Sequence, residues 1–286
     1  MNRTLLFEAN MTSFFMKKLS LLLLMLAVAL VPIRAARFAA SFGNPGRIKS
    51  GYFAYPPIQP RQIDYKVIDN STSPGNSRFK NEIGEDNAHY GVMLGSGYVF
   101  SLLDIHVSEG KGYTEVTLIV ESFREAGIEV YPLEVASTID NYIRVNSDYI
   151  QSFEGDALRE FEGIMYHEST HVWQWTGNGQ APQSLLNGIA DYVRLKAGFP
   201  SVNWGERGSG DSWDQGYEVT AYFLEYCGGL KGGFVAQLNA MMKDSYSDNF
   251  FDSLLGKSVD QLWSDYKLAY GNSPIASPAM PPVPGN

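Results

Sequence analysis

The segment from Asp156 to Trp175 constrains the fold most, because it combines an amphipathic helical pattern with two histidines and a glutamate. Asp156 can cap the start of a helix, and Gly177 and Gly179 follow its end. The apolar residues recur at helical spacing, and they are Leu158, Phe161, Met165, Val172 and Trp175. The pattern predicts one helix that buries its apolar stripe in a core.

Two histidines of this segment, His167 and His171, have the i, i+4 spacing that places both imidazoles on one helix face. Neutral imidazoles suit Zn²⁺, and a catalytic zinc takes three protein ligands and a water. Glu168 lies next to the first histidine and can act as general base toward that water. The HExxH pattern therefore predicts a zinc-dependent hydrolytic site. The alternative is that both histidines are ordinary helix residues near a Trp-rich core.

A third ligand is expected from the next helical segment, LLNGIADYV, which offers Asn187 and Asp191 on one face. Asp191 is an anionic oxygen donor, whereas Asn187 offers only a neutral carbonyl oxygen. We therefore predict His167, His171 and Asp191 as the metal ligands. Two alternatives remain for Asp191: it accepts a hydrogen bond from a histidine and orients it, or it lies exposed on its helix.

Tyr217 is a further catalytic candidate, because a tyrosine hydroxyl can stabilise an oxyanion. The alternative is a buried structural tyrosine. Trp173 and Trp175 flank the end of the proposed metal helix, and we predict that both belong to the core and not to a substrate subsite. The segment Asn141–Asp148 is predicted to be an edge strand along which a peptide substrate pairs by its main chain.

The order of the predicted elements indicates an α+β fold. Strand patterns occur at 64–69, at 113–122 and within 141–150, and the middle of 78–103 is helical. Helical patterns then follow the HExxH helix at 182–196, 214–226, 234–243 and 259–270. The sequence thus predicts a small mixed sheet followed by a helical half that carries the HExxH helix.

The first 35 residues have the pattern of a secretory signal peptide. Lys17 and Lys18 precede the apolar run Leu19–Val31, and small residues follow it. A spanning helix needs about 20 apolar residues, more than this run provides, and this favours a cleaved signal peptide. The alternative is a membrane-tethered ectodomain. The predicted division is a signal peptide at 1–35, an irregular extension at 36–63, a main domain at 64–271 and a Pro-rich flexible tail at 272–286.

The charge and cysteine content exclude several classes of protein. A formal net charge of -9 argues against binding to nucleic acid or to anionic membrane surfaces. Cys227 is the only cysteine, so no intramolecular disulfide can form. A secreted domain of this length must therefore be stabilised by its hydrophobic core.

The chain resembles the plant basic secretory proteins over Asp64 to Gly271. The segments that carry the resemblance are YHESTHVWQWTGNGQAP, NGIADYVRLKAGF, SWDQGYEVTAYFLEY and LGKSVDQLWSDYK. The resemblance implies a secreted, zincin-like peptidase, similar to the catalytic domains of gluzincin aminopeptidases and associated with defence against pathogens. It also implies that the first residue of EGIADYV supplies the third ligand. In this chain Asn187 stands at that position.

Two hypotheses follow. In the first, the protein is a secreted zinc peptidase of plant defence or the cell wall that acts on peptide or protein substrates, without stable membrane insertion after signal cleavage. In the second, it is a non-catalytic secreted protein that keeps the fold and binds a pathogen or cell-wall component. The intact HExxH motif favours the first hypothesis, and Asn187 favours the second.

Overall fold

A computed structural model of the chain describes residues 63–71, 77–106, 109–128 and 134–271. The predicted signal peptide and Pro-rich tail lie outside the described residues, and so does the predicted extension except for its last residue. Within the described ranges, no helix is both long enough and apolar enough to cross a membrane.

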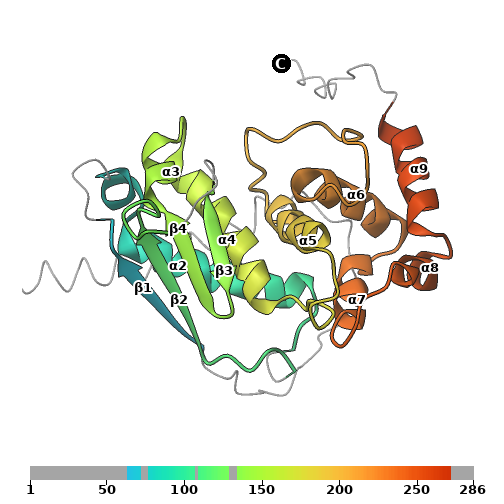
Figure 1. The fold of residues 1–286 in the computed structure, drawn as a ribbon, viewed down its shortest axis with the longest axis horizontal. Coiled ribbons are helices and arrows are strands. Elements are labelled where there is room, and N and C mark those ends of the chain that lie inside the picture. The colour runs from blue at the N-terminus through green and yellow to red at the C-terminus, as the bar shows by residue number, and fades with distance from the viewer. Residues whose placement is uncertain (1–62, 72–76, 107–108, 129–133, 272–286) are drawn as a thin grey trace, which may run out of the picture. The chain divides into compact units, whose positions relative to one another are not determined.

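The first half of the described chain forms a mixed β-sheet with strand order β1-β2-β4-β3 (Figure 1). The strands are β1 (Asp64–Asp69), β2 (Glu115–Glu121), β3 (Ala136–Ile139) and β4 (Tyr142–Asn146). β1 and β4 each pair in parallel with β2, and their registers place Val67 and Ile143 opposite Leu118. β3 pairs antiparallel with β4. The predicted small mixed sheet is therefore confirmed, as are the strands expected at 64–69 and 113–122.

The edge strand beside the HExxH helix is β3, so the prediction that Asn141–Asp148 forms the edge was wrong. β4 lies between β2 and β3 in the sheet. The chain then turns at Ser147 into the short helix α3 (Ser147–Ser152). Asp140 lies in the turn between β3 and β4 and has a positive φ of 54°. This conformation permits the tight hairpin in which β4 runs back along β3.

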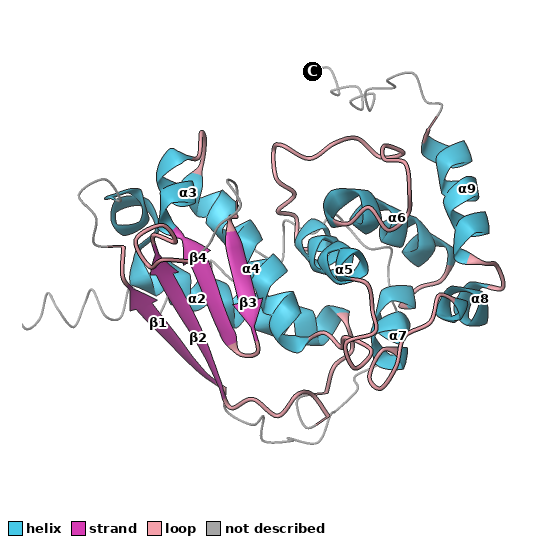
Figure 2. Cartoon of the chain, viewed as in Figure 1, coloured by secondary structure: helices cyan, strands magenta, loops and turns pink. Residues whose placement is uncertain are grey.

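Two helices pack against the sheet (Figures 1 and 2). After the π-helical turn η1 (Phe79–Ile83), helix α2 (Gly84–Leu102) contacts β1 and β2, while α4 (Ala157–Trp173) contacts β3 and β4. α2 and α4 also pack closely on each other. A Cβ atom added at Gly95 of α2 would lie 2.9 Å from the Met165 carbonyl oxygen of α4. Glycine in α2 therefore permits the close approach that holds the HExxH helix in place.

The HExxH helix begins and ends close to the predicted positions. The Asp156 side chain caps it by accepting a hydrogen bond from the Arg159 amide at 3.0 Å. Phe161, Met165 and Val172 of its apolar stripe are fully buried. Trp173 is also buried and donates from Nε1 to Ser96 Oγ at 3.0 Å, while Trp175 is half-buried against the core. The stripe thus fixes which face of α4 carries the histidines.

The second half of the described chain is helical, as predicted. Its helices are α5 (Gln183–Lys196), α6 (Tyr217–Leu230), α7 (Phe234–Met241), α8 (Asn249–Leu255) and α9 (Val259–Tyr270). α5 packs between α4 and α6 (Figure 1). A capping box of Ser258 and Gln261 starts α9. α8 was not predicted, because it is short and its start has no side-chain cap.

The packing of α5 on α6 depends on Gly188, and Gly188→Ala is expected to destabilise the fold. An added Cβ would lie 2.2 Å from Thr220 Cγ2, so the two helices would have to separate. We expect the free energy of unfolding to fall by about 1–3 kcal/mol in urea denaturation. Gly97→Ala on α2 is the matched control, since no atom lies within 4 Å, and it should raise stability by about 0.5–1 kcal/mol. Equal effects of the two substitutions would contradict this packing.

Candidate active site

A cavity of about 1050 Å³ is lined by residues of β3, α4, α5 and the start of α6. Every site residue predicted from the sequence lines it: His167, Glu168, His171, Asn187, Asp191 and Tyr217. Among the described residues that form its wall, neither Trp173 nor Trp175 is present, in agreement with their predicted place in the core. The fold therefore brings residues from three separate helices to one cavity.

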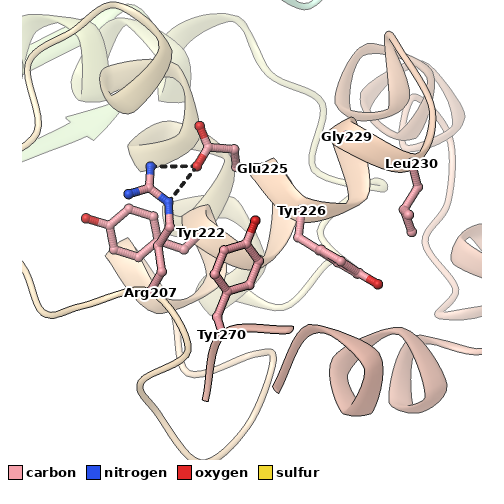
Figure 3. A pocket seen from close by; sticks show the side chains of 7 residues that line it. All are labelled: Arg207, Tyr222, Glu225, Tyr226, Gly229, Leu230 and Tyr270. Atoms are coloured by element: carbon pink, nitrogen blue, oxygen red, sulfur yellow. Dashed lines mark hydrogen bonds and ion pairs between the residues drawn. The ribbon is translucent and has the colours of Figure 1, made fainter. Parts of the chain in front are cut away.

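A second and smaller cavity, of about 200 Å³, shares no lining residue with the first (Figure 3). Its wall is formed by Arg207, Tyr222, Glu225, Tyr226, Gly229, Leu230 and Tyr270. Arg207 donates to Glu225 Oε2 from Nε at 3.0 Å and from Nη2 at 2.7 Å, and it lies 4.6 Å from the centre of the Tyr222 ring. Both charged groups are thus already paired, and the larger cavity is the candidate site.

The two histidines converge through their Nε2 atoms, which lie 3.1 Å apart. Both side chains come from one face of α4, and their rings are nearly perpendicular at 77°. Burial lowers the pKa of His171 well below its ordinary value, and the nearby charges of His167 and Lys111 lower it further. His171 is therefore a neutral imidazole whose lone pair is available to a ligand.

Asp191 contacts the opposite edge of the first histidine. His167 Nδ1 lies 2.6 Å from Asp191 Oδ1, and the carboxylate is buried. Burial opposes protonation of His167, but the charge and hydrogen bond of Asp191, with the charge of Glu168, outweigh it and raise the pKa. This contact directs Nε2 toward His171. It corresponds to the alternative role for Asp191, in which the carboxylate accepts a hydrogen bond from a histidine and orients it. To act as the predicted third ligand, the carboxylate would have to leave this hydrogen bond.

Substitutions at Asp191 separate the two roles. If Asp191 orients His167, Asp191→Ala should weaken zinc binding by about 10–100-fold, because the imidazole loses its acceptor. Asp191→Asn should weaken it less, since an amide oxygen can still accept from Nδ1. Chelator competition measures both dissociation constants. Equal, large losses in the two variants would instead identify Asp191 as a metal ligand.

The second histidine also has side-chain partners. Gln174 Nε2 lies 2.7 Å from His171 Nδ1, and the Asn187 side chain forms a hydrogen bond with His171 that favours its charged form. Gln174 was not predicted as a site residue. The available signal was its i+3 spacing from His171, at the end of the same helix.

Glu168 is held from the edge strand of the sheet. Thr138 of β3 donates from Oγ1 to Glu168 Oε2 at 2.6 Å, and the carboxylate is buried. Burial raises the pKa of Glu168, against the opposing effects of His167 and Thr138, and the carboxylates of Asp191 and Glu134 add to the rise. A base whose pKa is raised toward neutral accepts and returns a proton more readily. Thr138 was not predicted, because no local pattern links it to a helix 30 residues away.

Tyr217 lies at the cavity and is not a buried structural residue. It is the first residue of α6 and has a positive φ of 45°, which is rare for an aromatic side chain. Its ring lies nearly parallel to that of His167, with the centres 6.2 Å apart, and 54% of the residue is exposed. Burial of the remainder raises its pKa, so the hydroxyl stays protonated and can donate. Such strain costs about 1–3 kcal/mol and is concentrated at functional sites.

Two cationic side chains that the sequence did not predict also line the cavity. Lys111 donates to the His171 carbonyl oxygen at 3.3 Å, and burial lowers its pKa to about 8. Arg194 of α5 donates from Nη2 to Glu160 Oε2 of α4 at 2.8 Å. The first contact stabilises the end of α4 and the second links the two helices of the site.

Comparison with known protein families matches residues 60–266 to the family described as "Peptidase of plants and bacteria". The chain belongs to this family. A relative named "Basic secretory protease", from Boswellia serrata, is 44% identical over 59 residues, which is 21% of this chain and 67% of that protein. No solved structure matches the chain significantly.

The family match spans the whole candidate site, from Lys111 in the loop before β2 to Tyr217 at the start of α6. The resemblance seen in the sequence is therefore confirmed. Membership of a peptidase family suggests peptides or proteins as the class of substrate. The chain thus combines the HExxH helix of a peptidase with an asparagine on the neighbouring helix.

A metal ion in a protein needs several donor atoms directed at one point. Across the part of the chain that the structure describes, no three His, Cys, Asp or Glu side chains form a cluster that could hold a metal ion. The two imidazoles are positioned as metal ligands, since their Nε2 atoms converge and each Nδ1 has a side-chain partner. The residues present therefore fit a divalent ion through two nitrogens, with the neutral amide of Asn187 beside them.

Proposed function

We propose that this protein is a secreted, zinc-dependent peptidase with a zincin-like arrangement of sheet and helices. The observation that carries the proposal is the convergence of His167 and His171 at 3.1 Å, with Glu168 between them in the sequence and in the same cavity. Two histidines with an intervening glutamate on one helix are the ligands and base of zinc-dependent proteolysis. Family membership supports peptides or proteins as the substrates.

His167 and His171 would hold the ion, and Asn187 would lie beside it. When bound, zinc would act as a Lewis acid that polarises the scissile carbonyl and lowers the pKa of water. Asp191 keeps His167 oriented, because a carboxylate can only accept from Nδ1. The chain thus provides two oriented nitrogens and leaves the third protein position without an anionic ligand.

The proton transfers fall to Glu168. Its buried carboxylate, held by Thr138, takes a proton from the attacking water and gives it to the leaving amine. The Tyr217 hydroxyl donates a hydrogen bond to the carbonyl oxygen as negative charge develops there. β3 is an edge strand among the described residues and lines the cavity, so its main-chain groups can align an extended peptide beside Glu168.

Secretion and the biological setting rest on other observations. The relative is named a secretory protease, and residues 1–35 have the pattern of a signal peptide. The resemblance to the plant basic secretory proteins supports a role in defence or the cell wall. Mass spectrometry of protein recovered from the medium should give a mature N-terminus near Ala35.

The second candidate function is a non-catalytic secreted protein that binds a wall or pathogen component. One observation favours it: Asn187 occupies the position at which the resemblance places an anionic ligand. A site with two nitrogens and a neutral oxygen holds zinc less firmly than one with a carboxylate. The zinc affinity of the wild-type protein therefore separates the two candidates.

Zinc titration of the full chain with a competing chelator tests the proposal. We expect the wild type to bind one zinc ion and Asn187→Glu to bind it more tightly. Gln183→Glu is the matched control, because it adds the same charge to the cavity one turn earlier on α5 and should leave the affinity unchanged. Absence of zinc binding in the wild type would support the non-catalytic function. Equal affinities of wild type and Asn187→Glu would remove Asn187 from the metal shell.

A further inference from the structure

Lys111 is a cation of the large cavity that has no ion-pair partner among the described residues. It lies in the loop before β2, and its Nζ donates to the His171 carbonyl oxygen at 3.3 Å. Arg194, the other cation in the described part of this wall, is paired with Glu160. An ammonium group has three N–H donors, so Lys111 has two that remain for a ligand in the cavity.

The loop that carries Lys111 is held at the end of α4 and at the turn after β3. The Tyr113 ring packs against Trp173, with the ring centres 5.9 Å apart. The Tyr113 hydroxyl donates to Asp140 Oδ1 at 3.3 Å. The charge of Asp140 also acts on Lys111. The amine therefore has a defined place in the cavity wall, where the end of α4 and the Asp140 end of β3 come together.

Most other charged groups of the wall are negative. The described carboxylates that line the cavity are Glu134, Asp140, Glu160, Glu168, Asp191 and Glu218. Like charges repel each other and opposite charges attract, more strongly in a partly buried site than in water. A substrate carboxylate is therefore repelled along most of this wall and attracted at Lys111, and this contrast determines where an acidic group can bind.

Lys111 lies close to the bond on which Glu168 acts in the proposed function. Thr138 of β3 donates to Glu168 Oε2 at 2.6 Å, and Asp140 follows Thr138 by two residues. A strand advances about 3.3 Å per residue, so a peptide paired along β3 reaches the Asp140 end roughly two residues, or about 7 Å, from the cleaved bond. Lys111 is within reach of a substrate group at that position.

We propose that Lys111 is a specificity-determining residue that binds a carboxylate of the peptide substrate, roughly two residues from the cleaved bond. The carboxylate comes from an Asp or Glu side chain or from the C-terminus of the peptide. Its oxygens accept charge-assisted hydrogen bonds from the two N–H groups that the His171 carbonyl oxygen leaves unused. This inference rests on the proposed peptidase function and names the class of substrate for the same site.

The direction in which the peptide runs on β3 decides between the two sources of the carboxylate. In an antiparallel pairing, Lys111 lies on the N-terminal side of the cleaved bond, where a side chain must supply the carboxylate. In a parallel pairing, Lys111 lies on the C-terminal side, and the terminal carboxylate can also reach it. The position of the recognised charge therefore reports the direction of the peptide.

Matched peptides test the proposal on the full chain. Short labelled peptides carry Asp, Asn or Lys at one position at a time, and each is made with a free and with an amidated C-terminus. Mass spectrometry of the products identifies the cleaved bond, and kcat/KM is measured for each peptide. In the wild type we expect one position, or the free C-terminus, at which the carboxylate raises kcat/KM by about 10–100-fold over the corresponding amide.

Substitutions at Lys111 separate its charge from its contact with α4. Lys111→Gln keeps a donor for the His171 carbonyl oxygen but has no charge, so the acid and amide peptides should be cleaved equally well. Lys111→Arg should keep the preference for the carboxylate, and Lys111→Glu should reverse it in favour of the Lys peptide. Lys257→Met is the control, because it removes a positive charge from a residue outside this wall, and it should keep the wild-type preference.

A wild type without preference for the carboxylate, or a preference that Lys111→Gln retains, would overturn the proposal. Lys111 would then only stabilise the end of α4, and its loss would lower the cleavage of acid and amide peptides by the same factor. If Lys111→Gln does not fold, the reversal expected in Lys111→Glu decides.

Binding without hydrolysis distinguishes this inference from the proposed function. Fluorescence anisotropy measures the binding of the same peptides to Glu168→Gln, with and without Lys111→Gln. The carboxylate peptide should bind about 10–100-fold more tightly than its amide, and only when Lys111 is present. If the wild type cleaves no peptide but this difference is found, the peptidase function fails and the carboxylate site stands. Cleavage without any such difference leaves the function standing and overturns the inference. Absence of both cleavage and binding overturns both.

Discussion

Glu168→Gln is expected to lower kcat/KM for peptide hydrolysis by about 10²–10⁴-fold, the range that a general base contributes. The amide has nearly the shape of the carboxylate and can still accept the hydrogen bond from Thr138 Oγ1, 2.6 Å from Glu168 Oε2. It cannot take a proton from water. The loss should therefore appear in kcat, with zinc binding and folding retained. A fluorogenic peptide and a labelled, unfolded protein substrate provide the measurement.

Glu218→Gln is the matched control for this substitution. Glu218 also lines the cavity, and its removal changes the charge by the same amount without touching the histidines. We expect a change in kcat of only a few-fold. Comparable losses in the two variants would mean that the charge of the cavity, and not proton transfer by Glu168, governs hydrolysis.

Arg194→Met is expected to lower the free energy of unfolding by about 3–5 kcal/mol, because it leaves the Glu160 carboxylate buried without its cation. Both side chains of this pair are less than a tenth exposed. Glu160 would keep only the hydroxyl of Tyr149, at 3.1 Å. Since the pair joins α4 to α5, the distance between the histidines and Asp191 also depends on it. Urea denaturation measures the stability, and zinc titration reports the effect on the site.

Two further variants test whether the buried charge causes the loss. Glu160→Leu with Arg194→Met removes both charges and should recover most of the stability lost in the single variant. Lys257→Met breaks an exposed pair with Asp265 and should leave the stability almost unchanged. If the double variant is as unstable as Arg194→Met alone, packing and not the unpaired carboxylate explains the effect.

Features determined by neighbouring residues could be predicted from the sequence. The apolar stripe and Asp156 cap specified α4, and the capping box of Ser258 specified the start of α9. The convergence of His167 and His171 followed from their spacing on a helix. The helical pattern at 182–196 located the neighbouring helix, which carries Asn187 and Asp191 on one face.

Features that depend on distant contacts could not be predicted. β3 is a short strand whose position at the sheet edge depends on its pairing with β4, so Thr138 could not be assigned to Glu168. The role of Asp191 depends on which nitrogen of His167 it meets, and helix spacing does not decide that. The positive φ of Tyr217 depends on how the loop before α6 enters the helix, and α6 therefore begins later than its pattern predicted.

In the zinc site that we propose, Asn187 offers a neutral oxygen where the sequence resemblance implies a carboxylate. The two histidines are oriented by Asp191 and Gln174, and we expect this orientation to compensate in part for the missing charge. We therefore expect a site that is filled by zinc but exchanges it more readily than a site with three charged or nitrogen ligands.

Removal and return of the metal test the proposed zinc-dependent peptidase activity most directly. The purified full chain is dialysed against a chelator, assayed for hydrolysis of an unfolded protein, and assayed again after addition of one equivalent of zinc. We predict that hydrolysis falls to the level of Glu168→Gln and returns with zinc in the wild type but not in that variant. Hydrolysis that persists after chelation, or that Glu168→Gln retains, would contradict a zinc-dependent peptidase at this site.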